Sequence, residues 1–181
     1  MYKTWEELEK ACSNCNGCKL YSNRKNVVIG TGNKKASVMF IGEGPGADED
    51  EQGIPFVGKA GKLMNQCLEG LGVKREEIYI ANIVKCRPPG NRNPEPDEIA
   101  VCLSYLEAQI KLVGPEKIVL LGSVSLQNIL GKEYAITKSR GKWIEKDGIQ
   151  YMPTFHPAAL LRDEHKKIDF WKDLKEVFKK S

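Results

Sequence analysis

Three polar elements of this sequence stand where a ligand could bind, each directly after an apolar run that predicts a buried strand. The predicted strands are residues 37–41, 78–82 and 151–155. The first is followed by the turn GEGPG, the second ends in Asn82, and the third is followed by His156. In a parallel sheet, ligands bind beyond the carboxyl ends of the strands. A single buried asparagine or histidine is more often structural, but three such elements from distant segments predict one shared ligand site.

The turn after the first strand, residues 42–46, precedes a run of four acidic residues, Asp48 to Glu51. Glycines that follow a strand let backbone N–H groups approach a ligand closely. Carboxylates at this place would repel a phosphate, so the turn suits a neutral ligand better than a nucleotide. The alternative is a chance glycine turn beside solvated acidic residues. We expect Asp50 and Glu51 to be solvated on either interpretation.

The sequence contains six cysteines, at positions 12, 15, 18, 67, 86 and 102. Disulfides are disfavoured in a cytoplasmic protein, so metal binding is the leading interpretation. Cys15 and Cys18 form a C-x-x-C pair that can reach one metal centre, but Cys12 forms a second such pair with Cys15 and could replace Cys18. Four thiolates can hold zinc or an iron–sulfur cluster, and spacing alone does not separate the two. Cys67 and Cys102 lie on apolar helical faces, so from the residues alone core packing is the preferred interpretation for both.

Strands and helices alternate along the chain, which predicts a parallel sheet covered on both faces. We expect an α/β fold: a three-layer α/β/α sandwich with a central, mainly parallel four-stranded sheet. The expected strands are residues 37–41, 78–82, 117–121 and 151–155, with an extended edge segment at 27–32 and a hairpin within 135–152. The expected helices are residues 4–11, 59–71, 96–113, 122–130 and 169–180.

Length and composition limit the architecture and the class of partner. With 181 residues, 41% of them hydrophobic, we expect a single domain over residues 1–181, and a monomer. No apolar run approaches membrane-spanning length and the N-terminus lacks a signal peptide's apolar stretch, so we expect a cytoplasmic protein with no membrane partner. The net charge of +4 supports a polyanion partner only mildly. Two basic clusters are better explained, each taken singly, as solvated surface: Lys85, Arg87 and Arg92, and Lys138, Arg140 and Lys142.

Taken together, these segments resemble the family 4 uracil-DNA glycosylases, the iron–sulfur branch of the uracil-DNA glycosylase superfamily. The match covers almost the whole chain and is carried by GEGPG with its acidic run, GIPFVGKAG, NIVKCRPPGNRNP, FHPAALLR and CNGCKL. The resemblance implies an enzyme that flips uracil out of single- or double-stranded DNA and hydrolyses its N-glycosidic bond, leaving free uracil and an abasic site for base excision repair. It also implies a structural [4Fe-4S] cluster held by Cys15, Cys18, Cys86 and Cys102.

The same resemblance implies roles for the residues of the ligand site. Phe56 would stack on the base, Asn82 would read its Watson–Crick edge, and His156 would donate to O2, where charge develops. Backbone groups of Glu43 and Gly44 would contact the other side of the base. The better-known branch of the superfamily has a water-activating aspartate where this chain has Gly44, so Glu43 and Glu49 are the candidates here. Glu49 could orient water, exclude the 5-methyl group of thymine, or both.

The segment FHPAALLR resembles the family's loop that enters the minor groove, where an apolar side chain can fill the gap left by a flipped base. Leu160 or Leu161 is the expected wedge, and Arg87 and Arg162 are expected DNA contacts. Core packing of the leucines is the alternative.

Other classes of protein make different demands on the sequence. A family 5 glycosylase departs from this chain at GEGPG and its acidic run. A non-catalytic iron–sulfur module that binds DNA in replication or repair would need none of Phe56, Asn82 and His156. A zinc-stapled nucleotide-binding protein is disfavoured by the acidic residues after the glycine turn.

Overall fold

The structure, a computed structural model, describes residues 1–180. At its centre is a twisted sheet of six strands in the order β1-β3-β2-β4-β6-β5. The four inner strands are parallel and the two edge strands are antiparallel to their neighbours. The strands are β1 (Thr31–Gly32), β2 (Val38–Gly42), β3 (Tyr79–Asn82), β4 (Lys117–Leu121), β5 (Ile144–Lys146) and β6 (Ile149–Thr154).

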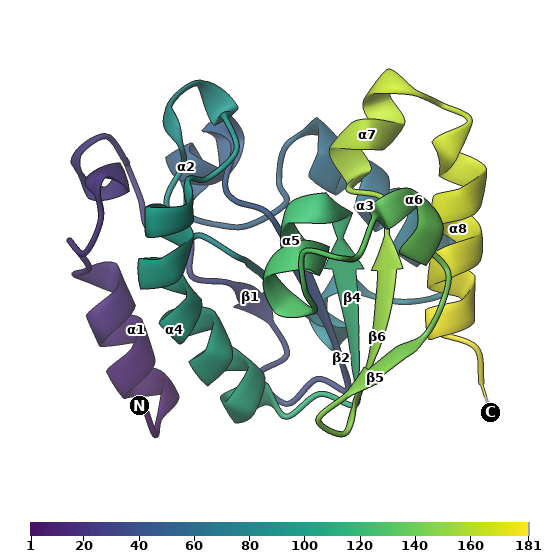
Figure 1. The fold of residues 1–181 in the computed structure, drawn as a ribbon, viewed down its shortest axis with the longest axis horizontal. Coiled ribbons are helices and arrows are strands. Elements are labelled where there is room, and N and C mark those ends of the chain that lie inside the picture. The colour runs from purple at the N-terminus through teal and green to yellow at the C-terminus, as the bar shows by residue number, and fades with distance from the viewer. Residues whose placement is uncertain (181) are drawn as a thin grey trace.

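Helices cover both faces of this sheet (Figure 1). They are α1 (Trp5–Ser13), α2 (Ala47–Gln52), α3 (Lys59–Gly70), α4 (Pro96–Val113), α5 (Gly122–Ile129), α6 (Ile136–Ser139), α7 (Pro157–Arg162) and α8 (Lys166–Val177), with short 3-10 helices η1 (Lys19–Ser22), η2 (Arg75–Glu77) and η3 (Pro89–Asn91). In Figure 1, α1, α4 and α5 lie on one face, α3 and α8 lie on the other, and α2 and α7 stand beyond the strand ends.

The inner strands are almost wholly apolar because both of their faces are buried. In β2, Met39 and Ile41 join a core that includes residues of α1, α4 and α5, whereas Val38 and Phe40 join a second core that includes residues of α3 and α8. Alternate side chains of a strand point to opposite faces, so one five-residue strand contributes to both layers of packing. The rigid sheet that results fixes the positions of the residues that follow each strand.

The three-layer α/β/α arrangement and its four parallel strands are confirmed, but the predicted number of strands is wrong. Two short antiparallel strands extend the sheet. One of them, β5, pairs with β6 in the hairpin predicted within residues 135–152. The other, β1, comprises only two residues of the predicted segment 27–32. Upstream of β1, Val28 donates its N–H to the carbonyl oxygen of Lys85, which lies beyond the end of β3, so this part of the segment does not pair with β3. No helix within residues 1–180 is long and apolar enough to cross a membrane.

Candidate active site

A cleft of about 570 Å³ opens beyond the carboxyl ends of the central strands, where a parallel sheet binds its ligands. Its volume is within the range of small-molecule sites. Six of its lining residues are the ones that the sequence singled out, namely Glu43, Gly44, Glu49, Phe56, Asn82 and His156. The predicted convergence of distant segments on one site is therefore what the structure shows.

Asn82 is the last residue of β3, and its side chain is 2% exposed. Its Oδ1 atom has no hydrogen-bond partner among residues 1–180, although buried acceptors are nearly always paired. The neighbouring strand leaves room for this amide because it ends in Gly42. A Cβ atom at Gly42 would lie 2.6 Å from Asn82 Oδ1 and 2.5 Å from Phe56 Cζ. The site thus holds an unpaired acceptor ready for a ligand that donates a hydrogen bond.

Phe56 has a left-handed backbone, with φ at 54°, which is rare for a bulky residue. Its ring is buried and lies 5.5 Å from the ring of His156, centroid to centroid. Arg75, in η2, donates from Nη1 to Phe56 O at 2.5 Å and from Nη2 to Pro55 O. The guanidinium therefore holds the strained backbone that presents the ring. Nothing in the local sequence of Arg75 indicated this role, because its partners lie about twenty positions earlier.

His156 is the N-cap of α7, and its Nδ1 accepts a hydrogen bond from Ala158 N at 3.1 Å. Burial lowers the pKa of the imidazole to about 4, with a further lowering by Arg162 and an opposing effect of Glu49. The ring is therefore neutral near pH 7. Because Nδ1 is an acceptor, the single ring proton is on Nε2. His156 can act as a neutral donor.

The two candidate carboxylates lie in different environments. Glu49 Oε1 accepts from Gly46 N at 3.0 Å, and Oε2 accepts from Val57 N at 2.8 Å and Gly58 N at 2.7 Å. These bonds tie the glycine turn to the segment that carries Phe56. The carboxylate of Glu43 is half-buried in the cleft, and burial raises its pKa. Glu49 is thus engaged with the backbone, whereas Glu43 faces the ligand space.

The prediction that Asp50 is solvated is wrong, since its side chain is only 3% exposed. Its Oδ1 accepts from Lys25 N at 2.9 Å and from Asn26 N at 3.2 Å, which offsets the cost of burying the carboxylate. Helix α2 is thereby attached to the segment that follows the first cysteines. Glu51 is exposed as predicted and pairs with Lys25 at 2.6 Å.

The segment FHPAALLR forms a helical turn, α7, rather than an open loop. Leu160 is 1% exposed and packs in the core beside α3 and α8, whereas Leu161 is 50% exposed. Leu160 is therefore wrong as a DNA wedge, because a helix turns consecutive side chains to different faces. Arg162 lines the cleft, and Arg87 donates from Nε to Asn91 Oδ1 at 2.8 Å.

Solvated surface describes only part of the two basic clusters: Lys138 and Lys142 are exposed, whereas three other cations have interior partners. Arg92 forms a two-pronged pair with the buried carboxylate of Glu98, with both N–O distances at 2.8 Å. Arg140 does the same with the buried Asp173, at 3.0 and 2.5 Å. Lys85 is 1% exposed, and burial lowers its pKa to about 8. Interior partners account for these three cations.

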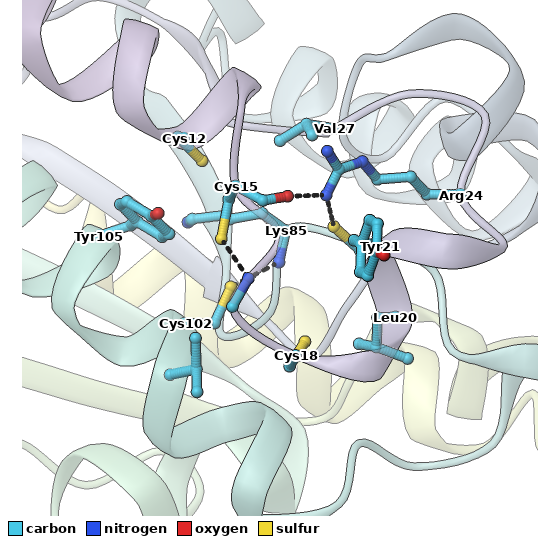
Figure 2. A pocket seen from close by; sticks show the side chains of 13 residues that line it. Cys12, Cys15, Cys18, Leu20, Tyr21, Arg24, Val27, Lys85, Cys102 and Tyr105 are labelled. Atoms are coloured by element: carbon cyan, nitrogen blue, oxygen red, sulfur yellow. Dashed lines mark hydrogen bonds between the residues drawn. The ribbon is translucent and has the colours of Figure 1, made fainter.

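Five of the six cysteines line a second, smaller cavity: Cys12, Cys15, Cys18, Cys86 and Cys102. Figure 2 labels Cys12, Cys15, Cys18 and Cys102 around this cavity, together with Lys85 and Arg24. The five cysteines come from the end of α1, the loop after it, the segment after β3, and α4. Cys67 lies elsewhere, in α3, and packs against the second core, as core packing predicts for it. The four predicted ligands thus meet in space, and Cys12 lies with them.

Three of these sulfur atoms accept hydrogen bonds from nitrogen. Cys15 Sγ accepts from Gly17 N, Cys102 Sγ from Lys85 N and Cys86 Sγ from Arg24 Nη1, at 3.4, 3.2 and 3.5 Å. Burial raises the pKa of Cys102 to about 11 and of Cys12 to about 12, so these thiols lose their protons near pH 7 only to a metal. In residues 1–180 no three acidic, histidine or cysteine side chains are arranged to hold a single metal ion. The cysteine side chains and their N–H partners supply the sulfur donors that a thiolate-ligated cluster would need.

Comparisons with known proteins agree with this arrangement. The model of the Uracil DNA glycosylase superfamily matches residues 29–175. The chain is 46% identical over 171 residues to a type-4 uracil-DNA glycosylase of Thermotoga maritima, covering 91% of this chain and 89% of the relative. It is also 46% identical to a type-4 uracil-DNA glycosylase of Sulfurisphaera tokodaii, covering 97% of this chain and 82% of the relative.

A relative of another kind is a DNA polymerase of Bacillus phage SP01. It is 38% identical over 146 residues, which are 80% of this chain but 16% of the polymerase. The matches to the two glycosylases span most of both proteins, whereas the match to the polymerase spans a small part of it. The chain belongs to the uracil-DNA glycosylase superfamily and, within it, to the type-4 uracil-DNA glycosylases.

Proposed function

We propose that the chain is a uracil-DNA glycosylase that flips uracil out of DNA and hydrolyses its N-glycosidic bond. The observation that carries this proposal is the unpaired, buried Oδ1 of Asn82 in the cleft beside Phe56. Uracil has a donor at N3 and an acceptor at O4, so the two atoms of the Asn82 amide can pair with both. Cytosine has no hydrogen at N3 and an amine at C4, so it would leave the amide mispaired.

The other residues of the cleft support the departure of the base. Phe56 offers a ring face for stacking, and the Nε2–H of neutral His156 can donate to uracil O2. When the C1′–N1 bond breaks, its electron pair leaves with the base, and negative charge grows on O2. A donor fixed at that atom binds the transition state more strongly than the ground state. Backbone groups of Glu43 and Gly44, which also line the cleft, would contact the opposite edge of the base.

Water must add to C1′ as the base leaves. We assign its orientation to Glu43, whose carboxylate is half-buried in the cleft. Glu49 is assigned a positioning role, because both of its oxygens accept backbone N–H groups that hold the Phe56 segment. From the same position Glu49 can also exclude the 5-methyl group of thymine.

We assign contacts with DNA to three side chains. Leu161 is the exposed apolar side chain of α7 and the proposed wedge, and Arg162 and Arg87 are proposed contacts to phosphates. The substrates are uracil-containing single- and double-stranded DNA. The products are free uracil and an abasic site in an uncut strand, released by a monomer.

The cysteine cavity is assigned to a [4Fe-4S] cluster held by Cys15, Cys18, Cys86 and Cys102. The cluster would supply a cross-link between segments distant in sequence, and no electron transfer is required for hydrolysis. Analysis of iron and sulfide in anaerobically purified protein, together with its absorbance at about 400 nm, tests this assignment. Stoichiometric zinc without iron would contradict it.

An oligonucleotide with a single uracil tests the function directly. We expect release of free uracil and an alkali-labile abasic site, with no strand cut before alkali. A borohydride-trapped covalent adduct would contradict a simple hydrolysis. The matched control is Asn82→Ala, which should lose excision while keeping the visible absorbance of the cluster.

The similarity to a small part of a phage DNA polymerase favours one second candidate, a non-catalytic iron–sulfur module that binds DNA. Such a module has no need of the unpaired Asn82 acceptor. DNA binding without any release of uracil from a fully loaded protein would favour it over the enzyme.

A further inference from the structure

The Lys85 side chain is fully enclosed, although lysine is almost never buried without a partner. Its Nζ donates to Asn82 O at 2.8 Å and to Gln109 Oε1 at 2.6 Å. Gln109 is itself fully buried and donates to Ile29 O at 2.8 Å and to the hydroxyl of Tyr79 at 3.1 Å. The ammonium thus lies in a fixed network, but its hydrogen-bond partners in residues 1–180 are neutral. A buried charge of this kind calls for a counter-charge nearby.

Lys85 also belongs to the cysteine cavity, where its side chain is visible beside Cys15 and Cys102 (Figure 2). Its backbone N donates to Cys102 Sγ at 3.2 Å, and its next neighbour in the chain is Cys86. At the other end of the side chain, Nζ holds the backbone carbonyl of Asn82, the residue with the unpaired acceptor. One residue therefore contacts both the cysteine site and the residue that lies in the cleft.

We propose that Lys85 is a positioning residue that couples the thiolate centre to the recognition of uracil. Thiolates bound to a metal centre would carry negative charge that offsets the buried ammonium, and the ammonium fixes the backbone of Asn82 and so the position of its amide. This inference rests on the proposed function, because it takes Asn82 as the residue that reads the base. It assigns the centre an effect on base recognition in addition to a cross-link between segments.

The main test is Lys85→Met in the full-length, cluster-loaded protein, because methionine fills similar space without charge or donor. Misplacing a recognition group by about 1 Å can cost on the order of 10² in rate. We expect kcat/KM for uracil release to fall by about 10- to 100-fold, with a similar loss of affinity for free uracil measured by calorimetry. We also expect the visible absorbance to decay several-fold faster in a chelator, because the centre loses its counter-charge.

The matched control is Gln109→Met, which removes the other partner of the ammonium and keeps both the charge and the bond to Asn82 O. It should lower the midpoint of thermal unfolding while changing uracil affinity and the decay of absorbance by no more than about twofold. If both variants lose uracil affinity in proportion to their loss of thermal stability, Lys85 only fills the core. Unchanged uracil affinity in Lys85→Met would also overturn the proposal.

If Lys85→Met does not fold, Lys85→Gln carries the same measurements, because it removes the charge and keeps a shorter donor. Its absorbance should decay faster than that of the wild type, and unchanged decay would contradict the counter-charge. The wild-type protein is assayed first. If the wild type does not release uracil, the proposed function itself is contradicted. If the wild type is active and the Lys85 variant has the same uracil affinity and absorbance decay, only the coupling is contradicted.

Discussion

At the scale of single residues, Gly42 determines how much room the base pocket has. A methyl group at this position would meet both the Phe56 ring and the Asn82 amide at less than 3 Å. We predict that Gly42→Ala slows single-turnover uracil excision by about 10² or more, because the amide and the ring cannot both keep their positions. Single-turnover excision kinetics measure this effect. An unchanged rate in a protein of normal thermal stability would show that the base does not use this space.

His156 gives a prediction about pH. The folded-state pKa of about 4 lies below the usual 6.5, so between these values the unfolded chain binds more protons than the folded chain. Burial of the neutral ring therefore contributes fully to the free energy of unfolding above about pH 6.5, and this contribution is lost as the pH falls toward about 4. NMR of ¹⁵N-labelled protein should show a neutral Nε2–H ring at pH 6, with His165→Gln used to assign the signals. A ring that titrates near 6.5 would contradict the buried, neutral donor.

At the scale of elements, η2 supports the strained turn at Phe56 through Arg75. Left-handed backbone costs a bulky residue on the order of 1–2 kcal/mol, so the conformation persists only where its surroundings enforce it. We predict that Arg75→Met lowers kcat/KM for uracil release by about tenfold, because the ring loses its fixed position. The comparison is Asn65→Ala, which removes another partner of the same guanidinium and leaves its bond to Phe56 O. Equal effects of the two changes would argue against a specific role in holding Phe56.

The positions of these elements explain which parts of the site the sequence could predict. Asn82 and His156 follow parallel strands, and such strands end at the same edge, so their convergence was predictable from pattern and spacing. The burial of Asp50, Leu160 and Lys85 was not, because it depends on partners that the sequence does not place beside them. Asp50 accepts from the backbone of residues 25 and 26, and Lys85 donates to Gln109. Charge type and local periodicity carry no information about such pairs.

At the scale of the whole molecule, the cysteine site joins the N-terminal segment to the segment after β3 and to α4. Closing long stretches of chain removes conformational freedom from the unfolded state, as any cross-link does. We predict that Cys86→Ser lowers the midpoint of thermal unfolding and abolishes most of the absorbance at about 400 nm. Cys67→Ser is the matched control, since Cys67 packs outside the cavity. Full absorbance in the Cys86 variant would indicate that Cys12 replaces it.

The fold as a whole was predictable because strands buried on both faces are continuous apolar runs that alternate with amphipathic helices. The edge strands β1 and β5 were less visible, because they span two and three residues and are partly exposed. The number of strands therefore came out too low, while the order of layers and the position of the cleft did not depend on it.

Helix α7 joins the two parts of the proposed reaction that act on opposite sides of the flipped nucleotide. His156 stands at its first turn, and the exposed Leu161 stands near its end. A helix rises about 1.5 Å per residue, so about 7–8 Å of rigid backbone separates them. On the proposed function, this fixed length would set the separation between the base in its pocket and the gap that it leaves in the duplex. Recognition through this separation would depend on the geometry of an extruded nucleotide and not on the bases on either side.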